Sequence, residues 1–216
     1  MKYELVIFDL DGTILDTLDD LAAAVNHALG LRGYPAKARD EVRRLIGNGV
    51  GNLIRRAVPE GTDDAKIART LSDFGAYYLS HVDVHTRPFP GIEALFDALN
   101  AAGARVAVNS NKVDAAVKAL CEAHFPSRVA LALGEREGIP RKPAPDGAAR
   151  ILRELGVDRA RALYVGDGET DLLTARNAGI DGAWVSWGYR RLEELGGLVV
   201  PRRFDSVEAL GRFLLD

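Results

Sequence analysis

Short apolar runs that end in polar residues recur along the chain. Residues 5–8 form an almost continuous apolar run that an Asp-Gly turn signal follows, and residues 106–108 and 162–165 have the same form. Runs of this length are typical of strands that are buried on both faces of a parallel sheet. Residues 129–133 and 183–185 predict further strands.

Apolar residues at helical spacing separate these runs. The spacing covers residues 92–99 and 151–155, and each stretch stops before a glycine, Gly103 or Gly156. Glycine just after the last periodic residue is a common helix end. The alternation of buried strands with such helices predicts an α/β sheet whose strands are joined by crossover helices.

Residues 16–84 interrupt the alternation. They carry amphipathic helical patterns without a convincing strand, and prolines in residues 87–91 mark the return of the chain. We therefore expect a helical domain over residues 16–84, inserted into a core made of residues 1–15 and 85–216. An insertion after the first strand would lie over the carboxyl end of the sheet, where open α/β folds bind ligands, and would serve as a lid.

Composition excludes several classes of function. The 216 residues carry a net charge of -3, so the chain lacks the basic field that non-specific nucleic-acid binding needs. Its apolar runs are shorter than the roughly 20 residues of a membrane span, and Met1 leads directly into the first strand-like run. We expect a cytoplasmic protein without nucleic-acid or membrane partners. The single cysteine, Cys121, excludes an intrachain disulfide and is expected on a helix packing face.

Two carboxylates follow the first strand, in the segment from Asp9 through Asp11 and Gly12 to Thr13. Such a pair can divide two tasks: one carboxylate attacks phosphorus, and the other protonates the departing oxygen and then activates water. We assign the attack to Asp9 and the acid/base role to Asp11. The alternative is a polar turn in which aspartate only ends the strand.

A second acidic segment, residues 166–171, follows a later strand and contains Asp167, Glu169 and Asp171. Carboxylate oxygens at the start of a helix suit Mg²⁺, which prefers oxygen ligands and keeps several waters. The candidate ligands are Asp167, Asp9 and the backbone carbonyl of Asp11. Helix capping explains any one acidic residue here, but it does not explain two acidic strand ends in one sheet.

A phosphate dianion needs positive charge and hydrogen-bond donors beside these carboxylates. Ser110 follows the second core strand, and its hydroxyl can donate to a phosphoryl oxygen. Lys142 lies in a proline-framed loop and can neutralise charge on the phosphoryl group. Taken singly, Ser110 fits a helix cap and Lys142 a solvated loop residue.

These motifs, in this order, resemble the haloacid dehalogenase superfamily over nearly the whole chain, and most closely its phosphoglycolate phosphatase-like branch with a helical cap. The resemblance implies a doubly wound, mostly parallel core. It also implies that Asp9 is the phosphorylated nucleophile, Asp11 the acid/base, Ser110 and Lys142 the phosphate-binding residues, and Asp167 the Mg²⁺ ligand supported by Asp171. Gly168 departs from the serine or threonine of many relatives, and Glu169 is an alternative ligand.

The resemblance also implies a substrate-contacting loop in the inserted domain. Gly47, Asn48 and Gly49 form a glycine-flanked turn between two helical stretches, which is similar to that loop. Arginines flank the turn, and Arg55 is the candidate for binding a substrate carboxylate. Thr13, Asn109 and Asn111 adjoin the catalytic candidates and complete the predicted substrate-binding set. His81 and His85 fit a helix end better than a metal pair. The expected partner is a small phosphorylated metabolite, with phosphoglycolate as the best candidate, and the expected assembly is a monomer or homodimer.

Several alternatives stay open at this point. Pyrophosphatase, nucleotidase and sugar-phosphate phosphatase activities use the same core, and a phosphomutase differs only in the fate of the aspartyl phosphate. Dehalogenation needs neither an acid/base nor Mg²⁺, so the full acidic set disfavours it. Phosphonatase chemistry needs a cap lysine, for which only Lys37 and Lys66 are available. A non-catalytic binding protein on the same fold is the alternative from a different class.

Overall fold

The computed structural model describes residues 2–47 and 49–216, which form two compact units. Unit 1 consists of Met1–Leu15 and Pro88–Asp216, and unit 2 is Asp16–Arg87. A short two-stranded sheet, β2 (Leu15–Asp16) with β3 (Arg87–Pro88), lies where the chain passes from one unit to the other and back. The predicted fold class, an α/β core with an inserted helical segment, is confirmed.

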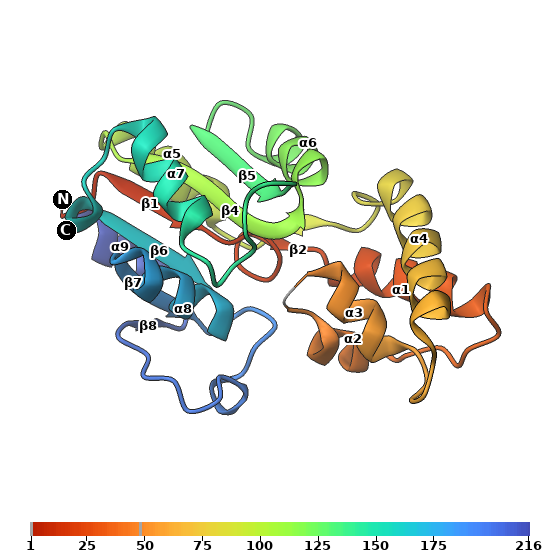
Figure 1. Cartoon of the computed structure of the whole chain (residues 1–216). Helices are drawn as coiled ribbons and strands as arrows, with labels where there is room; N and C mark the ends of the chain where they lie inside the picture. Colours follow the sequence, from red (N-terminus) through yellow and green to blue (C-terminus); the bar gives the residue numbers. More distant parts are fainter. Residues whose placement is uncertain (1, 48) are drawn as a thin grey trace. The chain divides into compact units, whose positions relative to one another are not determined.

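Unit 1 is built on one parallel sheet (Figure 1). Its strand order is β5-β4-β1-β6-β7-β8, so the chain builds outward from the central β1 to one edge and then to the other, as in a doubly wound fold. In the register of β1, Ile7 lies opposite Ala107 of β4 and Tyr164 of β6. The bounds are β1 Leu5–Phe8, β4 Arg105–Val113, β5 Leu131–Glu135, β6 Ala162–Gly166, β7 Asp181–Val185 and β8 Arg203–Phe204.

Helices cover both faces of this sheet, which explains why β1 is apolar at every position. Side chains alternate across a strand, so Phe8 faces one way and packs on Phe96 of α5 with ring centroids 5.1 Å apart. Ile7 faces the other way and shares a buried cluster with Ile151 of α7 and Ala175 of α8. The helices of unit 1 are α5 Ile92–Ala101, α6 Asp114–His124, α7 Asp146–Leu155, α8 Glu169–Ala178 and α9 Val207–Leu215, with short 3-10 turns η1 Arg159–Arg161 and η2 Leu192–Glu194.

Two local predictions about these helices are confirmed. Gly156 ends α7 in the left-handed conformation, at φ 63°, where a side chain would be strained. Cys121 is buried on the packing face of α6, and burial raises the pKa of its thiol to about 12. A thiol in this state is a packing group rather than a nucleophile.

The described part of unit 2 is helical. It contains α1 (Leu18–Gly30), α2 (Arg39–Leu45), α3 (Val50–Ala57) and α4 (Asp64–Ser80), and α1 packs along α4. Val25 and Leu29 of α1 are fully buried, and Phe74 of α4 is 2% exposed. His81 follows α4 directly and stacks on Tyr77 with centroids 3.9 Å apart, as expected for a helix end.

The buried carboxylate of Asp20 joins α1 to the returning chain. Asp20 is 2% exposed and accepts hydrogen bonds from the backbone amides of Val84, His85 and Thr86, over 2.9–3.1 Å. The Thr86 hydroxyl adds a further bond of 2.8 Å. A carboxylate with this many donors is well satisfied, so Asp20 fixes the last residues of unit 2 against its first helix.

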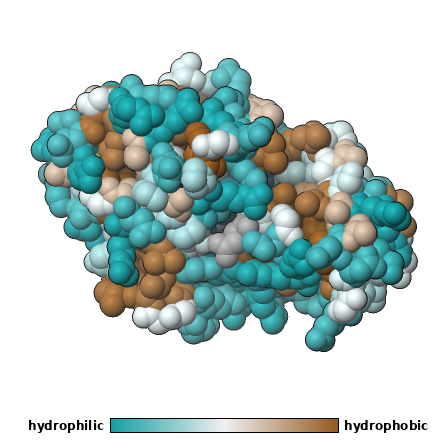
Figure 2. Space-filling model, viewed as in Figure 1, coloured by the Kyte–Doolittle hydropathy of each residue, from teal (hydrophilic) through white to brown (hydrophobic). Residues whose placement is uncertain are grey.

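The surface carries polar side chains over most of the face in Figure 2, with apolar residues in separate groups. Such exposure of apolar side chains is ordinary in folded proteins. Among the described residues, no helix combines the length and the apolar composition of a membrane span. The large apolar side chains with the greatest exposure are Leu31, Leu79, Val84, Val113, Leu192, Val199, Phe213 and Leu215.

Replacement of Asp20 tests this link within unit 2. Asp20→Ala removes the acceptor of the hydrogen bonds from Val84, His85 and the buried Thr86, so we expect the free energy of unfolding to fall by about 3 kcal/mol. Urea denaturation and amide hydrogen exchange of residues 84–86 measure the effect. The control is Asp19→Ala, because Asp19 is 41% exposed and its pair with Arg39 lies at the surface. Equal stability of the two variants would contradict the role of Asp20.

Candidate active site

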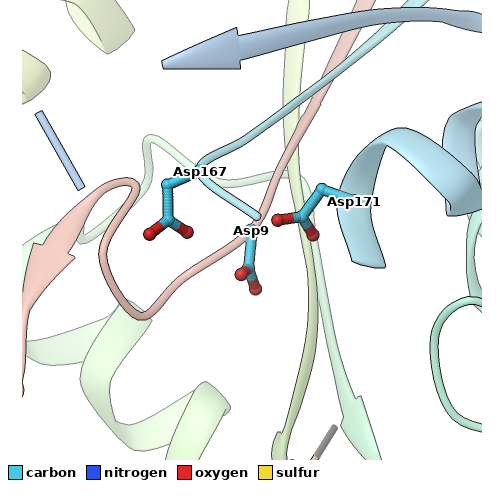
Figure 3. A group of neighbouring side chains, drawn as sticks. All are labelled: Asp9, Asp167 and Asp171. Carbon is cyan, nitrogen blue, oxygen red and sulfur yellow. The ribbon is translucent and has the colours of Figure 1, made fainter. Parts of the chain in front are cut away.

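Three aspartates converge at the carboxyl end of the central strands. Asp9 follows β1, Asp167 follows β6, and Asp171 lies in the first turn of α8. Each offers a carboxylate oxygen within 4.8 Å of the others (Figure 3). Because parallel strands end at the same edge of the sheet, residues far apart in the sequence meet here.

Lys142 supplies positive charge beside two of these aspartates. Its Nζ lies 2.8 Å from Asp9 Oδ1 and 2.7 Å from Asp171 Oδ1, and its side chain is 5% exposed. Asn111 holds the lysine backbone from both sides, since its Oδ1 accepts from Lys142 N at 2.8 Å and its Nδ2 donates to Lys142 O at 3.1 Å. The predicted loop lysine is therefore buried and fixed at the carboxylates.

The electrostatics of the group show excess negative charge. Burial raises the pKa of Asp9, and Asp171 raises it further, although Lys142 opposes the shift. Burial, with a contribution from Asp171, raises the pKa of Asp167 to about 7. Burial alone would lower the pKa of Lys142, but Asp171 and Asp9 outweigh it and hold this pKa well above its usual value. One ammonium group does not neutralise three buried carboxylates.

The donor set fits a hard divalent cation. Asp9 Oδ1 is buried and accepts no well-aligned hydrogen bond, although Lys142 Nζ is close to it. Buried oxygens that lack a full set of donors suit a metal with oxygen ligands, and Mg²⁺ prefers such ligands. Among the described residues, Asp9, Asp167 and Asp171 form the group that can hold a metal ion.

Asp171 has structural contacts that Glu169 lacks. Its Oδ2 accepts a hydrogen bond of 3.0 Å from the backbone amide of Gly168, and its Oδ1 contacts Lys142. Glu169 instead pairs with Arg190, with 3.3 Å between Oε2 and Nε. Gly168 has no side-chain hydroxyl, but its backbone amide orients Asp171. Of the two predicted alternatives for the third acidic contact, the geometry favours Asp171.

A segment after β7, residues 187–189, orients Asp167, and sequence reasoning missed it. The Tyr189 amide donates to Asp167 Oδ2 at 2.6 Å, and Trp187 Nε1 donates to the Thr13 carbonyl at 3.0 Å. Thr13 is fully buried and its hydroxyl lies 3.3 Å from Asp167 Oδ1. The only available signal was the location of residues 187–189 just after an apolar run.

Glycines let the loops of the site approach one another. A Cβ at Gly188 would lie 2.3 Å from the Cβ of Asp167 and from the carbonyl oxygen of Gly12. A Cβ at Gly166 would lie 2.2 Å from Asp171 Cγ. Gly12 also has φ 85°, which favours glycine. At Gly188 and Gly166 the neighbouring atoms lie so close that any residue with a Cβ would collide with them.

The remaining predicted residues of unit 1 lie around β4. Ser110 is 5% exposed, and its Oγ accepts from the amide of Lys112 at 3.2 Å. Asp11 contacts Lys112, with 2.8 Å between Oδ1 and Nζ, and sequence reasoning gave Lys112 no role. Asn109 is buried against Gly147, where a Cβ would lie 2.5 Å from its Oδ1. Asn109, Ser110, Asn111 and Lys142 also line one pocket.

Of the predicted substrate residues of unit 2, Gly47 and Gly49 lie between α2 and α3, and Arg55 lies in α3. Gly47 and Gly49 have positive φ, 124° and 83°, and Gly49 precedes α3. Arg55 forms a surface ion pair of 2.9 Å with Asp64. Asn48 lies outside the described residues. Contact of these residues with a substrate stays a prediction.

Replacement of Gly188 tests the close approach of the loops. The Cβ of Gly188→Ala collides with Asp167, so the carboxylate must shift, and we expect Mg²⁺ affinity to fall at least about tenfold. Titration calorimetry measures this affinity. Gly75→Ala in α4 is the control, because its Cβ meets nothing within 4 Å. Unchanged affinity in Gly188→Ala would show that Asp167 does not bind the metal in this geometry.

The family match and the similar proteins agree on one family for this chain. The family described as haloacid dehalogenase-like hydrolase matches residues 6–185. A phosphoglycolate phosphatase of Mesorhizobium japonicum is 34% identical over 96% of this chain and 94% of its own length. One from Caulobacter vibrioides is 35% identical over 92% and 86%.

Solved structures agree with this result. A crystal structure of a Lactobacillus delbrueckii subsp. bulgaricus protein, proposed to be a phosphoglycolate phosphatase, has a TM-score of 0.94 and 36% identity, and the match covers 100% of this chain and 99% of that one. The family match and these relatives span the strands that carry Asp9, Ser110 and Asp167. The chain therefore belongs to the haloacid dehalogenase-like hydrolase family and is a phosphatase of that family.

Proposed function

We propose that this phosphatase is a Mg²⁺-dependent phosphomonoester hydrolase that works through a phosphorylated Asp9. The observation that carries the proposal is the convergence of Asp9, Asp167 and Asp171, with the buried ammonium group of Lys142 in contact with Asp9 and Asp171. A nucleophilic carboxylate must approach an anionic phosphoryl group, so it needs neighbouring positive charge. Lys142 contributes that charge, and Asp167 and Asp9 would hold the metal together with the backbone carbonyl of Asp11.

In the first step, an oxygen of Asp9 attacks phosphorus and the bond from phosphorus to the leaving oxygen breaks. Asp11 gives its proton to that oxygen, so the leaving oxygen departs as a hydroxyl group rather than as an alkoxide. Lys142 and the hydroxyl of Ser110 interact with the phosphoryl oxygens. Bound Mg²⁺ supplies further positive charge, which offsets the negative charge of the phosphoryl group.

In the second step, Asp11 takes a proton from water, whose oxygen attacks the phosphorus of the aspartyl phosphate. The bond between phosphorus and Asp9 breaks, and inorganic phosphate leaves. Asp171 contributes by orienting Lys142 and through its contact with the Gly168 amide. This division of roles makes Asp11 both the acid of the first step and the base of the second.

Phosphoglycolate is the proposed substrate. The relatives from Mesorhizobium japonicum and Caulobacter vibrioides that cover most of this chain carry the name phosphoglycolate phosphatase. In this proposal unit 2 acts as the cap, and Gly47, Asn48, Gly49 and Arg55 recognise the part of the substrate beyond the phosphate. A Schiff-base mechanism gains no support from Lys66, which is 62% exposed and pairs with Asp63.

Metal dependence can be tested through stability. In the metal-free protein, the raised pKa of Asp167, about 7, makes the folded state hold a proton that the unfolded chain releases near pH 4. This contribution to stability is full below pH 4 and is lost as the pH rises through 7. Bound Mg²⁺ favours the ionised carboxylates of Asp167 and Asp9. We therefore expect Mg²⁺ to raise the melting temperature more at pH 8 than at pH 5.

The control for this measurement is Asp167→Asn, which should lose most of the Mg²⁺ effect at both pH values. Without metal, the same variant should remove part of the fall in stability between pH 5 and pH 8. A Mg²⁺ effect that is equal at both pH values, or one that persists in Asp167→Asn, would contradict this metal site.

Activity is tested by phosphate release from phosphoglycolate, pyrophosphate, nucleoside monophosphates and sugar phosphates, with and without Mg²⁺. We expect Mg²⁺-dependent release that is fastest with phosphoglycolate. Asp9→Asn should lower kcat at least about 10³-fold because it removes the nucleophile while keeping the shape. Asp97→Asn is the control, since Asp97 is 58% exposed in a surface pair with Arg128. Wild-type turnover in Asp9→Asn would disprove the assignment, and faster release from another member of the panel would correct the substrate.

A further inference from the structure

Lys112 is a buried lysine to which neither the motif pattern nor the proposed roles above assign a task. Its side chain is 2% exposed, and its Nζ lies 2.8 Å from Asp11 Oδ1. Its backbone amide donates to Ser110 Oγ at 3.2 Å. One residue therefore contacts both the proposed acid/base and a proposed phosphate-binding hydroxyl.

The local backbone directs Lys112 to this position. Asn109 pairs with Leu133 and Val113 with Glu135, so a step of four residues along β4 matches a step of two along β5. Such a bulge changes the direction of the side chains on the bulged strand. Gly134 of β5 accommodates it, because a Cβ there would lie 2.6 Å from the Lys112 carbonyl oxygen. The bulge in β4 and the glycine opposite it in β5 thus determine the position of Lys112.

Stability alone is a weak reason for this pair. Burying an ammonium and a carboxylate costs desolvation energy that their attraction only partly offsets. The two lysines of the site contact different carboxylates: Lys142 contacts Asp9 and Asp171, whereas Lys112 contacts Asp11. The two carboxylates of the first motif, although two residues apart, are therefore held by different lysines.

We propose that Lys112 is a positioning residue that holds Asp11 for the hydrolysis of the aspartyl phosphate. The inference rests on the proposed function, because it concerns its second step. There a proton passes from water to the Asp11 carboxylate while the water oxygen bonds to phosphorus and the bond to Asp9 breaks. An ammonium group 2.8 Å from one oxygen of Asp11 holds the carboxylate in one orientation, which leaves its other oxygen to take the proton from water.

This role predicts which half of the reaction depends on Lys112. Without the ammonium group, attack by Asp9 continues but its phosphorylated form is hydrolysed slowly. The phosphorylated enzyme then accumulates during turnover. A residue that only maintains the fold, or that only binds substrate, would slow formation of the phosphorylated enzyme and would not make it accumulate.

The experiment compares the wild type with Lys112→Met, Lys112→Arg and Lys118→Met during steady turnover of the best substrate of the panel. Samples are quenched in acid, and intact-protein mass spectrometry measures the phosphorylated fraction. We expect Lys112→Met to lower kcat at least about tenfold and to be mostly phosphorylated, with partial recovery in Lys112→Arg. Lys118→Met should match the wild type, because Lys118 is 56% exposed in a surface pair with Asp114.

Two results would overturn the inference. In the first, Lys112→Met, folded by circular dichroism, turns over slowly without an increase in its phosphorylated fraction. In the second, it keeps the wild-type kcat and changes only KM. If Lys112→Met does not fold, Lys112→Gln, which keeps a polar side chain, is read by the same criteria. An active wild type with either result leaves the proposed function intact, whereas a wild type that is silent on every substrate removes both.

Discussion

Repulsion among buried carboxylates is the constraint on which the candidate site of unit 1 depends. Asp9, Asp167 and Asp171 lie within 4.8 Å of one another, where ionised groups of like charge would force each other apart. The Lys142 ammonium group contacts two of them, and burial with mutual repulsion raises the pKa of Asp9 and of Asp167. The strands supply the rigid support that keeps these groups together, and the remaining excess of negative charge is what a divalent cation can use.

The loops around this group follow from the same constraint. Asp167 and Asp11 are contacted by groups from other segments, the Tyr189 amide and Lys112, whereas Asp171 accepts from the amide of Gly168 at the start of its own helix. Such contacts need close approach of backbone, which the glycines at the loop ends permit. The site therefore consists of neighbouring segments that hold one another.

Sequence reasoning identified the residues that directly follow apolar strands, because parallel strands deliver their ends to one edge of the sheet. Asp9 and Asp167 belong to this class, whereas Ser110, predicted to follow the second core strand, lies inside β4 because that strand continues past the apolar run to Val113. Lys112 was missed because a bulge opposite Gly134, and no periodic pattern, determines where its side chain points. Residues 187–189 were missed because their role depends on a contact with Asp167 that local sequence does not encode. The proline-framed loop made Lys142 a candidate and the resemblance gave it a role, but its burial beside two carboxylates and its backbone hydrogen bonds with Asn111 are visible only in the structure.

We propose Asp9 as the nucleophile of a metal-assisted phosphoryl transfer. The most direct test is a crystal structure of the protein with Mg²⁺ and beryllium fluoride, which imitates a phosphoryl group on a carboxylate. We expect the fluoride group on an oxygen of Asp9, in contact with Lys142 and Ser110, and the metal at Asp9 and Asp167. A fluoride group bound to Asp11 or away from this edge of the sheet, or a metal held without Asp167, would contradict it.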